Sequence, residues 1–595
     1  MLGRNRSLLR LLALLMTFAL VAAACGGDND TASEETNTEP SDDSASSDND
    51  NTSDDNTSDD TSASDEAASD GADADDSVGV VEIEEDPVET GPVAGGTLRF
   101  GVQAETDGLN PTSSAFAPAG YTMANAVFDT LAAYDVDGNT VPFLAESFTP
   151  NDDFTSWTIK LREGISFHDG TPLNADAAML SYDTTRNDFL VGIAVRPFVQ
   201  AENGVEKVDD MTFRINLVDP WRYWPATVTG QLGMVASSKW LAAAIEDPTL
   251  NQEPVGTGPF IFDSRSQDSV TRFVRNDDYW LGEVYLDAIE FNIVTDAEVR
   301  TTLFDEEQLD GLHTNDPGSI DFLRSSDGVQ NALDDTGEEQ MDLINTSAPP
   351  FDDIRARRAL TLAAPQDNYV ALLGLGVTRR ADQIFEPNSP YYNPDVVQET
   401  DRPDEAAALA AEYCGDFPEN CTDNKINFVR QTTGPSINQT REAELLAEGW
   451  SVAFNMTSNE VPEDTGIQNA ATGAYQVADW RQFGAVDPSV DNVWLLCRTI
   501  GGLSLNFVQF CDEERDALLL AAQLEPDPAA RAALYQELAA KLNQDYTYIF
   551  YTHTLWDIAF AENVHGACGR TGPDGDDLLC QINGRTFYDS LWMSE

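Results

Sequence analysis

The chain has 595 residues, of which 104 are Asp or Glu and only 33 are Lys or Arg, giving a formal net charge of -71 at pH 7. This charge argues against nucleic acid or an anionic membrane surface as a partner, because each would repel the chain. The chain is long enough to bury a sizeable core in more than one lobe, and 41% of its residues are hydrophobic.

The first 24 residues have the pattern of an export signal. Arginines at the start accompany an apolar run over residues 8–24, which ends in small residues before Cys25 and two glycines. This pattern resembles a bacterial lipoprotein signal, in which Cys25 is lipidated and becomes the mature N-terminus. We therefore expect a protein held by lipid on the extracellular face of the membrane or in the periplasm. The alternative is an uncleaved membrane anchor, for which this run is barely long enough.

Residues 25–94 are predicted to form a disordered acidic linker. No Lys or Arg occurs between Leu11 and Leu98, and Asp, Glu, Ser, Thr, Asn, Ala and Gly dominate the segment. Such a sequence has too little apolar surface to offset the entropy of ordering, and its charges repel one another. We expect an extended linker between the lipid and the folded part. Calcium binding is a weaker alternative, because calcium ligands must be held in a rigid array.

The next elements are two strands. In residues 96–102 and 156–162 apolar and polar side chains alternate, which is typical of half-buried strands. Gly164 and the Asp169-Gly170 pair follow the second strand and supply turns. The sequence therefore predicts that the strand at 156–162 belongs to a hairpin.

Two helices are predicted near the C-terminal end. One covers residues 441–448 and is closed by Gly449. The other begins after Asp527, an N-cap residue followed by Pro528, and its apolar stripe consists of Ala530, Leu534, Leu538 and Leu542. Strands and helices mixed over some five hundred residues predict an α/β fold with more than one lobe.

Six cysteines follow Cys25, and all lie in the last third of the chain. An even number in an exported chain indicates disulfides. Of the fifteen possible connectivities we predict pairing between neighbours along the chain. A metal site is a weaker alternative, because the sequence has no CxxC motif and only four histidines, none in a close pair. The predicted pairs are Cys414 with Cys421, Cys497 with Cys511, and Cys568 with Cys580.

Several short segments then follow one another in a recognisable order. They are GTLRF at 96–100, LNP at 109–111, FDTL at 128–131, AESF at 145–148, WTIKLREGISFHDGTPL at 157–173, VGTGPF at 255–260, RNDDYW at 275–280 and PPFDDIRARRAL at 349–360. Their joint order and spacing resemble extracellular solute-binding protein family 5, whose members deliver oligopeptides, dipeptides or nickel chelates to ATP-driven importers.

The resemblance implies a two-lobed periplasmic-binding-protein-like α/β fold of class II, with an extra inserted subdomain and a hinge between the lobes. The first lobe would combine residues 95–128, 251–347 and 554–595. The inserted subdomain would cover 129–250, and the second lobe 348–553. A ligand favours closure only through its higher affinity for the closed form, so both lobes should contact it in the cleft between them.

The segment at 478–488, ADWRQFGAVDP, resembles the family's tryptophan followed by an Asp-Pro turn. By that resemblance Asp487 would take the ammonium group of a ligand through a charge-assisted hydrogen bond. Trp480 would form an apolar or cation-stacking wall, and Arg481 would answer a ligand carboxylate. The alternative is that Asp487 only forms the turn before Pro488.

Other residues that attract attention have plainer interpretations. His168 stands in a turn without a partner nearby in sequence, so we expect a structural or exposed side chain rather than a ligand. Arg355, Arg357 and Arg358 either help to bind an anion or, more commonly, solvate a helix face and pair with carboxylates. Residues 363–367 depart from the family pattern, which leaves the ligand class open.

These observations predict a substrate-binding lipoprotein of an ABC importer. It would capture a peptide or similar small polar solute as a monomer, with no cofactor and no metal, and pass it to the permease transmembrane subunits. One alternative is an extracellular peptide-sensing receptor without transport. A secreted hydrolase is weaker still, because the sequence has neither a GxSxG nor an HExxH motif.

Overall fold

The computed structural model describes three stretches of the chain, residues 91–334, 337–434 and 436–594. The predicted signal peptide at 1–24, Cys25 and all but the last four residues of the predicted linker lie outside these stretches. Within them, no helix has the length and apolar character needed to cross a bilayer.

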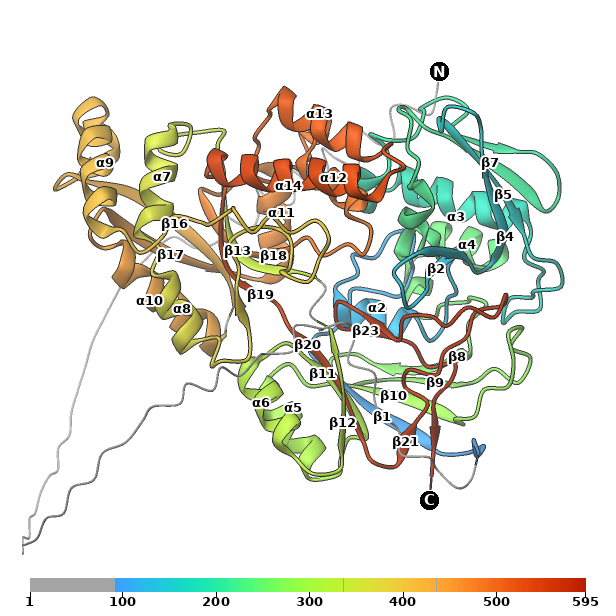
Figure 1. The fold of residues 1–595 in the computed structure, drawn as a ribbon. Coiled ribbons are helices and arrows are strands. Elements are labelled where there is room, and N and C mark those ends of the chain that lie inside the picture. The colour runs from blue at the N-terminus through green and yellow to red at the C-terminus, as the bar shows by residue number, and fades with distance from the viewer. Residues whose placement is uncertain (1–90, 335–336, 435, 595) are drawn as a thin grey trace, which may run out of the picture. The chain divides into compact units, whose positions relative to one another are not determined.

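A mixed seven-stranded sheet, here called the first sheet, contains the beginning of the folded chain (Figure 1). Its strands are β1 (Thr97–Val102), β8 (Phe260–Ser266), β9 (Val270–Arg275), β10 (Ala288–Ile293), β11 (Gly311–Thr314), β12 (Val329–Asp334) and β20 (Trp556–Ala561). They are ordered β12-β20-β11-β1-β10-β9-β8. Leu98, Phe100 and Val102 are fully buried, which confirms the strand predicted at 96–102.

The second sheet also has seven strands. They are β13 (Glu339–Ile344), β14 (Arg379–Arg380), β15 (Cys421–Thr422), β16 (Lys425–Thr433), β17 (Phe454–Val461), β18 (Val477–Gln482) and β19 (Tyr548–His553). Their order is β14-β19-β13-β18-β16-β15, and β17 pairs with β16. The chain thus passes from the first sheet to the second between β12 and β13, and returns between β19 and β20.

A third, four-stranded sheet lies within the predicted inserted subdomain. It has the order β4-β5-β7-β6, formed by β4 (Ala145–Pro150), β5 (Ser156–Leu161), β7 (Thr212–Asn216) and β6 (Val205–Lys207). β5 therefore pairs with β4 before it and with β7 far along the chain. The predicted strand at 156–162 does belong to a hairpin, but its partner is β4 before it. The Asp169-Gly170 turn after β5 closes only an isolated bridge between Ser166 and Pro172. Ile165 and Phe167 are buried in the core instead of continuing a ladder.

Short paired strands and helices complete the fold. The strands are β2 (Ala132–Tyr134), β3 (Thr140–Pro142), β21 (Val564–His565), β22 (Gln581–Ile582), β23 (Arg585–Thr586) and β24 (Trp592–Met593). The helices are α2 (Pro118–Ala124), α3 (Ala175–Asn187), α4 (Ser238–Glu246), α5 (Ala297–Asp305), α6 (Pro317–Ser325), α7 (Ile354–Ala363), α8 (Gln366–Leu372), α9 (Pro403–Asp416), α10 (Ile437–Trp450), α11 (Glu463–Thr472), α12 (Asn492–Leu495), α13 (Glu513–Ala522) and α14 (Pro528–Asp545). Helices α5 and α6 pack against β11 and β12, and α7 lies beside α9 (Figure 1).

The hydrophobic core is divided among the sheets. One cluster lies on the first sheet around Phe100 and Phe291, and another fills the space between the second sheet and α7, α9 and α10. The largest cluster is continuous from the third sheet to the second, since it contains both Ile159 of β5 and Phe550 of β19. The third sheet and the helices α13 and α14 therefore share one apolar interior. β13 hydrogen-bonds within the second sheet, although the predicted boundary at residue 347 assigns it to the first lobe.

Helix α14 begins where the sequence predicts, because Asp527 accepts a hydrogen bond from the Ala530 nitrogen at 2.9 Å. Its buried stripe is not the predicted one. Ala530 is exposed and Leu534 half-buried, whereas Arg531 and Tyr535 are buried together with Leu538 and Leu542. The prediction considers apolar residues alone, whereas in the structure Arg531 occupies a position on the buried face of the helix.

Helix α10 is longer than predicted. It continues through Gly449 to Trp450, so the prediction that Gly449 closes the helix is wrong. A Cβ atom at this position would lie 2.6 Å from the ring of Pro365. The glycine therefore permits close packing in the last turn of the helix.

The three disulfides of the structure join the predicted neighbours, Cys414 with Cys421, Cys497 with Cys511 and Cys568 with Cys580.

Candidate functional site

Arg481 lies where the first and second sheets meet. Its Nε atom is 2.6 Å from Oε2 of Glu338, and its guanidinium stands over the ring of Trp556 at 5.0 Å from the centroid. The Trp556 indole donates to the same Glu338 oxygen at 3.1 Å. Arg481 comes from β18 of the second sheet and Trp556 from β20 of the first, so this predicted site residue contacts both.

The backbone is closely packed beside this contact. A Cβ atom on Gly484 would lie 2.5 Å from the carbonyl carbon of Gly337, and the φ of Gly484 is +84°. Only glycine fits both requirements. The side chain of Asn583, from the turn between β22 and β23, donates to the Gly484 carbonyl at 2.9 Å. A segment near the C-terminus thus joins the end of β18 to the first sheet.

Trp480 points the other way from Arg481, because successive residues of a strand face opposite sides of the sheet. Its ring meets that of Phe507 edge-on with centroids 5.1 Å apart, and Phe507 also contacts Trp494 at 5.4 Å. The indole nitrogen donates to Oε1 of Gln482 at 3.0 Å. Trp480 and Trp494 are half-buried, so they form the edge of an aromatic group around Phe507.

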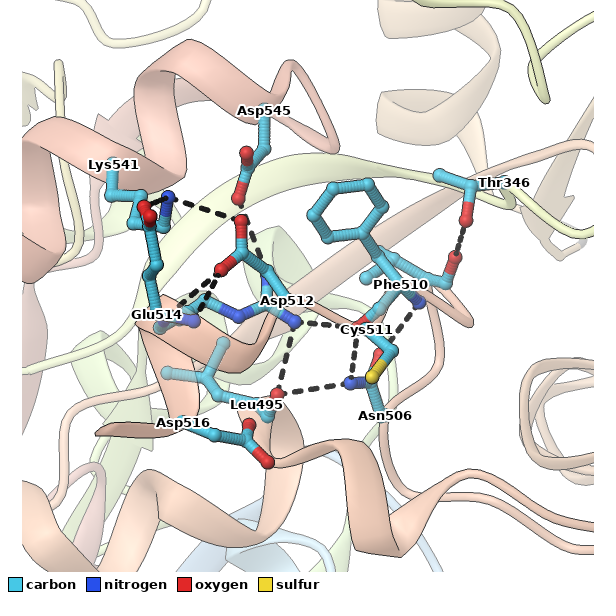
Figure 2. A network of polar contacts seen from close by, with 12 residues as sticks. Thr346, Leu495, Asn506, Phe510, Cys511, Asp512, Glu514, Asp516, Lys541 and Asp545 are labelled. Carbon is cyan, nitrogen blue, oxygen red and sulfur yellow. Dashed lines mark hydrogen bonds and ion pairs between the residues drawn. The ribbon is translucent and has the colours of Figure 1, made fainter. Parts of the chain in front are cut away.

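The loop that carries Phe507 is closed by the disulfide between Cys497 and Cys511. Figure 2 shows the polar network that supports it, in which the Asn506 amide donates to the carbonyls of Leu495 at 3.0 Å and Phe510 at 2.9 Å. Arg515 donates to the same two carbonyls at 3.0 and 2.6 Å. The loop that carries Phe507 is therefore stabilised both by a disulfide and by hydrogen bonds.

Asp487 is bound to Arg531. Nη2 of Arg531 donates to Oδ1 at 2.7 Å and Nη1 to Oδ2 at 3.0 Å, and the two side chains are only 6% and 12% exposed. Oδ1 also accepts from the nitrogen and hydroxyl of Ser489. Burial opposes the charged guanidinium, but the hydrogen bond and charge of Asp487 outweigh it and raise the pKa of Arg531. The carboxylate thus caps the short 3-10 helix at Pro488–Asp491 and holds a buried cation.

This ion pair lies against the predicted inserted subdomain. The Arg531 guanidinium stacks on Tyr223 at 3.7 Å from the ring centroid, and the Tyr223 hydroxyl donates to the Glu525 carbonyl at 2.7 Å. The Trp221 indole donates to the Ser489 hydroxyl at 2.9 Å. Trp480, Arg481 and Asp487 therefore each contact a different set of side chains. Arg531 was missed by the sequence analysis because it occupies a helix face that was predicted from apolar residues.

A buried group of ionisable side chains lies where the chain enters the second sheet at the start of β13 and leaves it at the end of β19. Nδ1 of His553 is 3.3 Å from Oε1 of Glu339 and 3.4 Å from Oε1 of Glu386. Burial lowers the pKa of His553 to about 3, so this imidazole is neutral at pH 7. Burial, followed by the charge of Glu386, holds the pKa of Glu339 well above its ordinary value. Burial likewise raises the pKa of nearby Asp491 to about 7.

The other residues considered from the sequence are structural. His168 is largely buried, and its Nε2 lies 2.9 Å from the Gly258 carbonyl. Burial lowers its pKa to about 4. Within the described stretches, no group of histidine, cysteine or carboxylate side chains is arranged to hold a metal ion.

The arginine cluster of α7 pairs mainly with neighbours on the protein. Arg355 binds Asp353 at 2.7 Å and Asp416 at 2.8 Å, and Arg358 lies 3.6 Å from Glu399. Arg357 is buried and donates to the Phe351 carbonyl at 2.9 Å.

Residues 363–367, where the sequence departs from the family pattern, form the break between α7 and α8. Gln366 is buried there and donates to the carbonyls of Ala381 and Tyr551 at 2.6 and 3.2 Å.

Comparison with known proteins agrees with this architecture. The family model described as "Bacterial extracellular solute-binding proteins, family 5 Middle" matches residues 139–501. The di/tripeptide-binding protein 2 of Pseudomonas aeruginosa is 25% identical over 79% of this chain and 92% of its own length. The heme-binding protein A of Haemophilus influenzae is 27% identical over 71% of this chain and 81% of its own length.

Among solved structures, the periplasmic binding protein DppA from Helicobacter pylori, in complex with the peptide STSA, has a TM-score of 0.73 at 17% identity and covers 84% of this chain and 99% of its own. This likeness shows a two-lobed periplasmic-binding-protein fold. With the family model matching more than half of its residues, the chain belongs to the bacterial extracellular solute-binding proteins of family 5.

Proposed function

We propose that the protein is the lipid-anchored substrate-binding component of an ABC importer, and that it captures a peptide or similar small polar solute between its lobes. The observation that carries this proposal is the contact of Arg481, on the second sheet, with Trp556, on the first. Only two chain crossings join these sheets. A solute that touches both sides of such a junction favours the closed form.

The lobes follow the predicted segments, with β13 counted in the second lobe because it hydrogen-bonds there. Peptides are the first ligand class to test, since relatives carry the names di/tripeptide-binding protein and dipeptide-binding protein. Other relatives are named for heme and nickel, so the scaffold itself does not fix the cargo.

The three predicted site residues take different parts in this proposal. Arg481, at the junction of the sheets, forms an ion pair with a ligand carboxylate. Trp480 supplies an apolar wall beside Phe507. Asp487 receives a ligand ammonium group only if that group competes with Arg531, which already holds both carboxylate oxygens. The alternative weighed from the sequence, Asp487 as a structural residue of its turn, is favoured by this pairing.

Anchoring through Cys25 and delivery to permease subunits complete the proposal. The protein acts as a monomer and leaves the solute chemically unchanged, in keeping with relatives that are named for binding rather than for catalysis. The extracellular face of the membrane, or the periplasm, is its place of action.

The test uses the full exported protein and a library of di- and tripeptides. A true ligand at a hundred times its Kd adds about 2.7 kcal/mol to the free energy of unfolding, so it raises the Tm. Small-angle X-ray scattering should show a smaller radius of gyration with the same ligand. Arg481→Gln should weaken binding, whereas Arg402→Gln, an exposed arginine paired with Glu399, should not. A ligand that binds tightly without changing the radius of gyration contradicts closure.

A further inference from the structure

Five carboxyl side chains gather around the junction between β13, β18 and the 3-10 helix at Pro488–Asp491. Three of them are paired with arginines: Glu386 with Arg379 at 3.8 Å, Glu338 with Arg481 at 2.6 Å, and Asp487 with Arg531 at 2.7 Å. Among the described residues, no lysine or arginine forms an ion pair with the other two, Glu339 and Asp491. The junction therefore has two more carboxyl groups than paired cations.

Glu339 is fully buried at the start of β13, with an exposed fraction of 0%. Its cross-strand neighbours are Gln482 on β18 and His553 on β19. Oε1 faces the neutral imidazole of His553, but Oε2 has no hydrogen-bond partner among the described residues. A buried carboxyl oxygen without a partner is costly. Glu339 is the first residue of β13 and follows Glu338, which contacts Arg481 and Trp556 where the sheets meet.

Asp491 is held beside the end of β18, whose last residue, Gln482, is the cross-strand neighbour of Glu339. Its Oδ2 accepts a hydrogen bond from the Ala485 nitrogen at 3.1 Å. Like Glu339, it is one of the groups whose charged form is opposed chiefly by burial. Carboxyl groups whose ionisation is opposed by burial and by neighbouring carboxylates would gain from one added positive charge.

An aromatic surface lies on the same side of the sheet. Gln482 is the cross-strand neighbour of Glu339, and the indole of Trp480 donates to Gln482 at 3.0 Å. Because residues two apart on a strand share a face, Trp480 and Glu339 lie on one side of the second sheet. Aromatic rings next to carboxylates suit organic cations, since a ring face attracts positive charge.

We propose that Glu339 and Asp491 together accept the cationic group of the bound solute, an ammonium or guanidinium group. This inference rests on the proposed function and narrows its cargo to solutes that carry positive charge. The cation would donate to the unpartnered Glu339 oxygen and favour the ionised form of the two carboxyl groups. A lysine or arginine side chain, a terminal amine and a free organic cation share this chemistry.

The experiment measures binding by isothermal titration calorimetry on the full exported protein at pH 8. The probes are Ala-Lys, its counterpart with an uncharged side chain Ala-norleucine, N-acetyl-Ala-Lys, free arginine and agmatine. If the cation is the side chain, we expect Ala-Lys to bind at least about tenfold tighter than Ala-norleucine, and Glu339→Gln to abolish this preference. A loss of affinity on N-acetylation that disappears in the same variant would identify the terminal amine as the cation.

Glu339→Gln preserves the size of the side chain, and Asp491→Asn provides an independent second variant if the first does not fold. Glu399→Gln is the matched control, because Glu399 is paired with Arg402 away from the junction. Equal affinities for Ala-Lys and Ala-norleucine together with no loss of affinity on N-acetylation, or a cation preference that survives both variants, would overturn the inference but leave solute binding intact. Binding of arginine or agmatine without any peptide would support the inference and reject peptide cargo. Failure of every probe to bind would reject both.

Discussion

The two faces of the second sheet each bury carboxyl side chains, but they satisfy them differently. On one face, Arg430 is fully buried and donates to Asp342 at 2.9 Å and to Glu442, and it lies 3.6 Å from Asp479. Tyr551 donates to Asp342 at 2.7 Å. On the other face, the neutral imidazole of His553 is the polar partner of Glu339 among the described residues. The comparison teaches that a carboxyl group surrounded by the protein's own donors is part of the core, whereas one without them is the better candidate for the proposed ligand contact.

The largest effect is expected from Arg430→Met. This change leaves three buried carboxyl groups around an apolar side chain, so the free energy of unfolding should fall by about 3–5 kcal/mol. Urea unfolding followed by circular dichroism measures the loss. The control is Arg402→Met, at the exposed N-cap of α9. It should leave the urea midpoint unchanged. A loss below about 1 kcal/mol would show that the network does not hold this face together.

Asp487→Ala should have the next largest effect. It leaves the Arg531 guanidinium buried without its carboxylate, which should cost about 2–3 kcal/mol of stability in urea unfolding. The double variant Asp487→Ala with Arg531→Met should recover part of this loss, because no unpaired charge remains. If the single variant is as stable as the wild type but binds amine-bearing peptides more weakly, Asp487 belongs with the ligand-accepting carboxyls instead.

Asp491→Asn should change the dependence of stability on pH. The pKa of Asp491 is about 7 in the folded protein, against an ordinary value of 3.8. The folded state therefore binds the proton more tightly, and stability decreases as pH rises from about 4 to about 7. The slope is on the order of 1.4 kcal/mol per pH unit while only the folded state is protonated. Unfolding curves at pH 5 and pH 7.5 should lie closer together for the variant; equal separation would contradict this assignment.

The smallest effect is expected at Lys160. Its ion pair with Glu146 at 2.6 Å is nearly half exposed on both sides, so solvent screens it. Lys160→Gln should leave the urea midpoint unchanged within error. A clear shift of the midpoint would show that exposed ion pairs also contribute to the stability of this protein.

Local signals in the sequence predicted the elements that depend on few residues. The alternation around Phe100 and the Asp527-Pro528 cap each specify an element within one turn or one strand, and both are confirmed. The cysteine pairing also succeeded because the partners are close in sequence. Gly449 misled the analysis, since a glycine that permits packing against Pro365 has the same local signature as one that ends a helix.

The group around Glu339 could not be predicted from the sequence. Glu339 and His553 are 214 residues apart, and only the pairing of β13 with β19 brings them together. Arg531 was missed for a related reason: helical periodicity identifies a buried face but not which polar residue on it finds a partner. The resemblance to the family supplied the two-lobed fold, while Trp480, Arg481 and Asp487 remain predictions as ligand contacts.

Both ends of the described chain lie with the first sheet. β1 is the central strand of that sheet, and β24 pairs with β21, which follows β20 of the same sheet. A tether joined to residue 91 would therefore pull directly on the first sheet. A tensile load from the tether would be borne by the interstrand bonds of β1 with β10 and β11, and not by the two connections that join the sheets. If residues 25–90 form the predicted linker, a pull through it would therefore load the first sheet before the second.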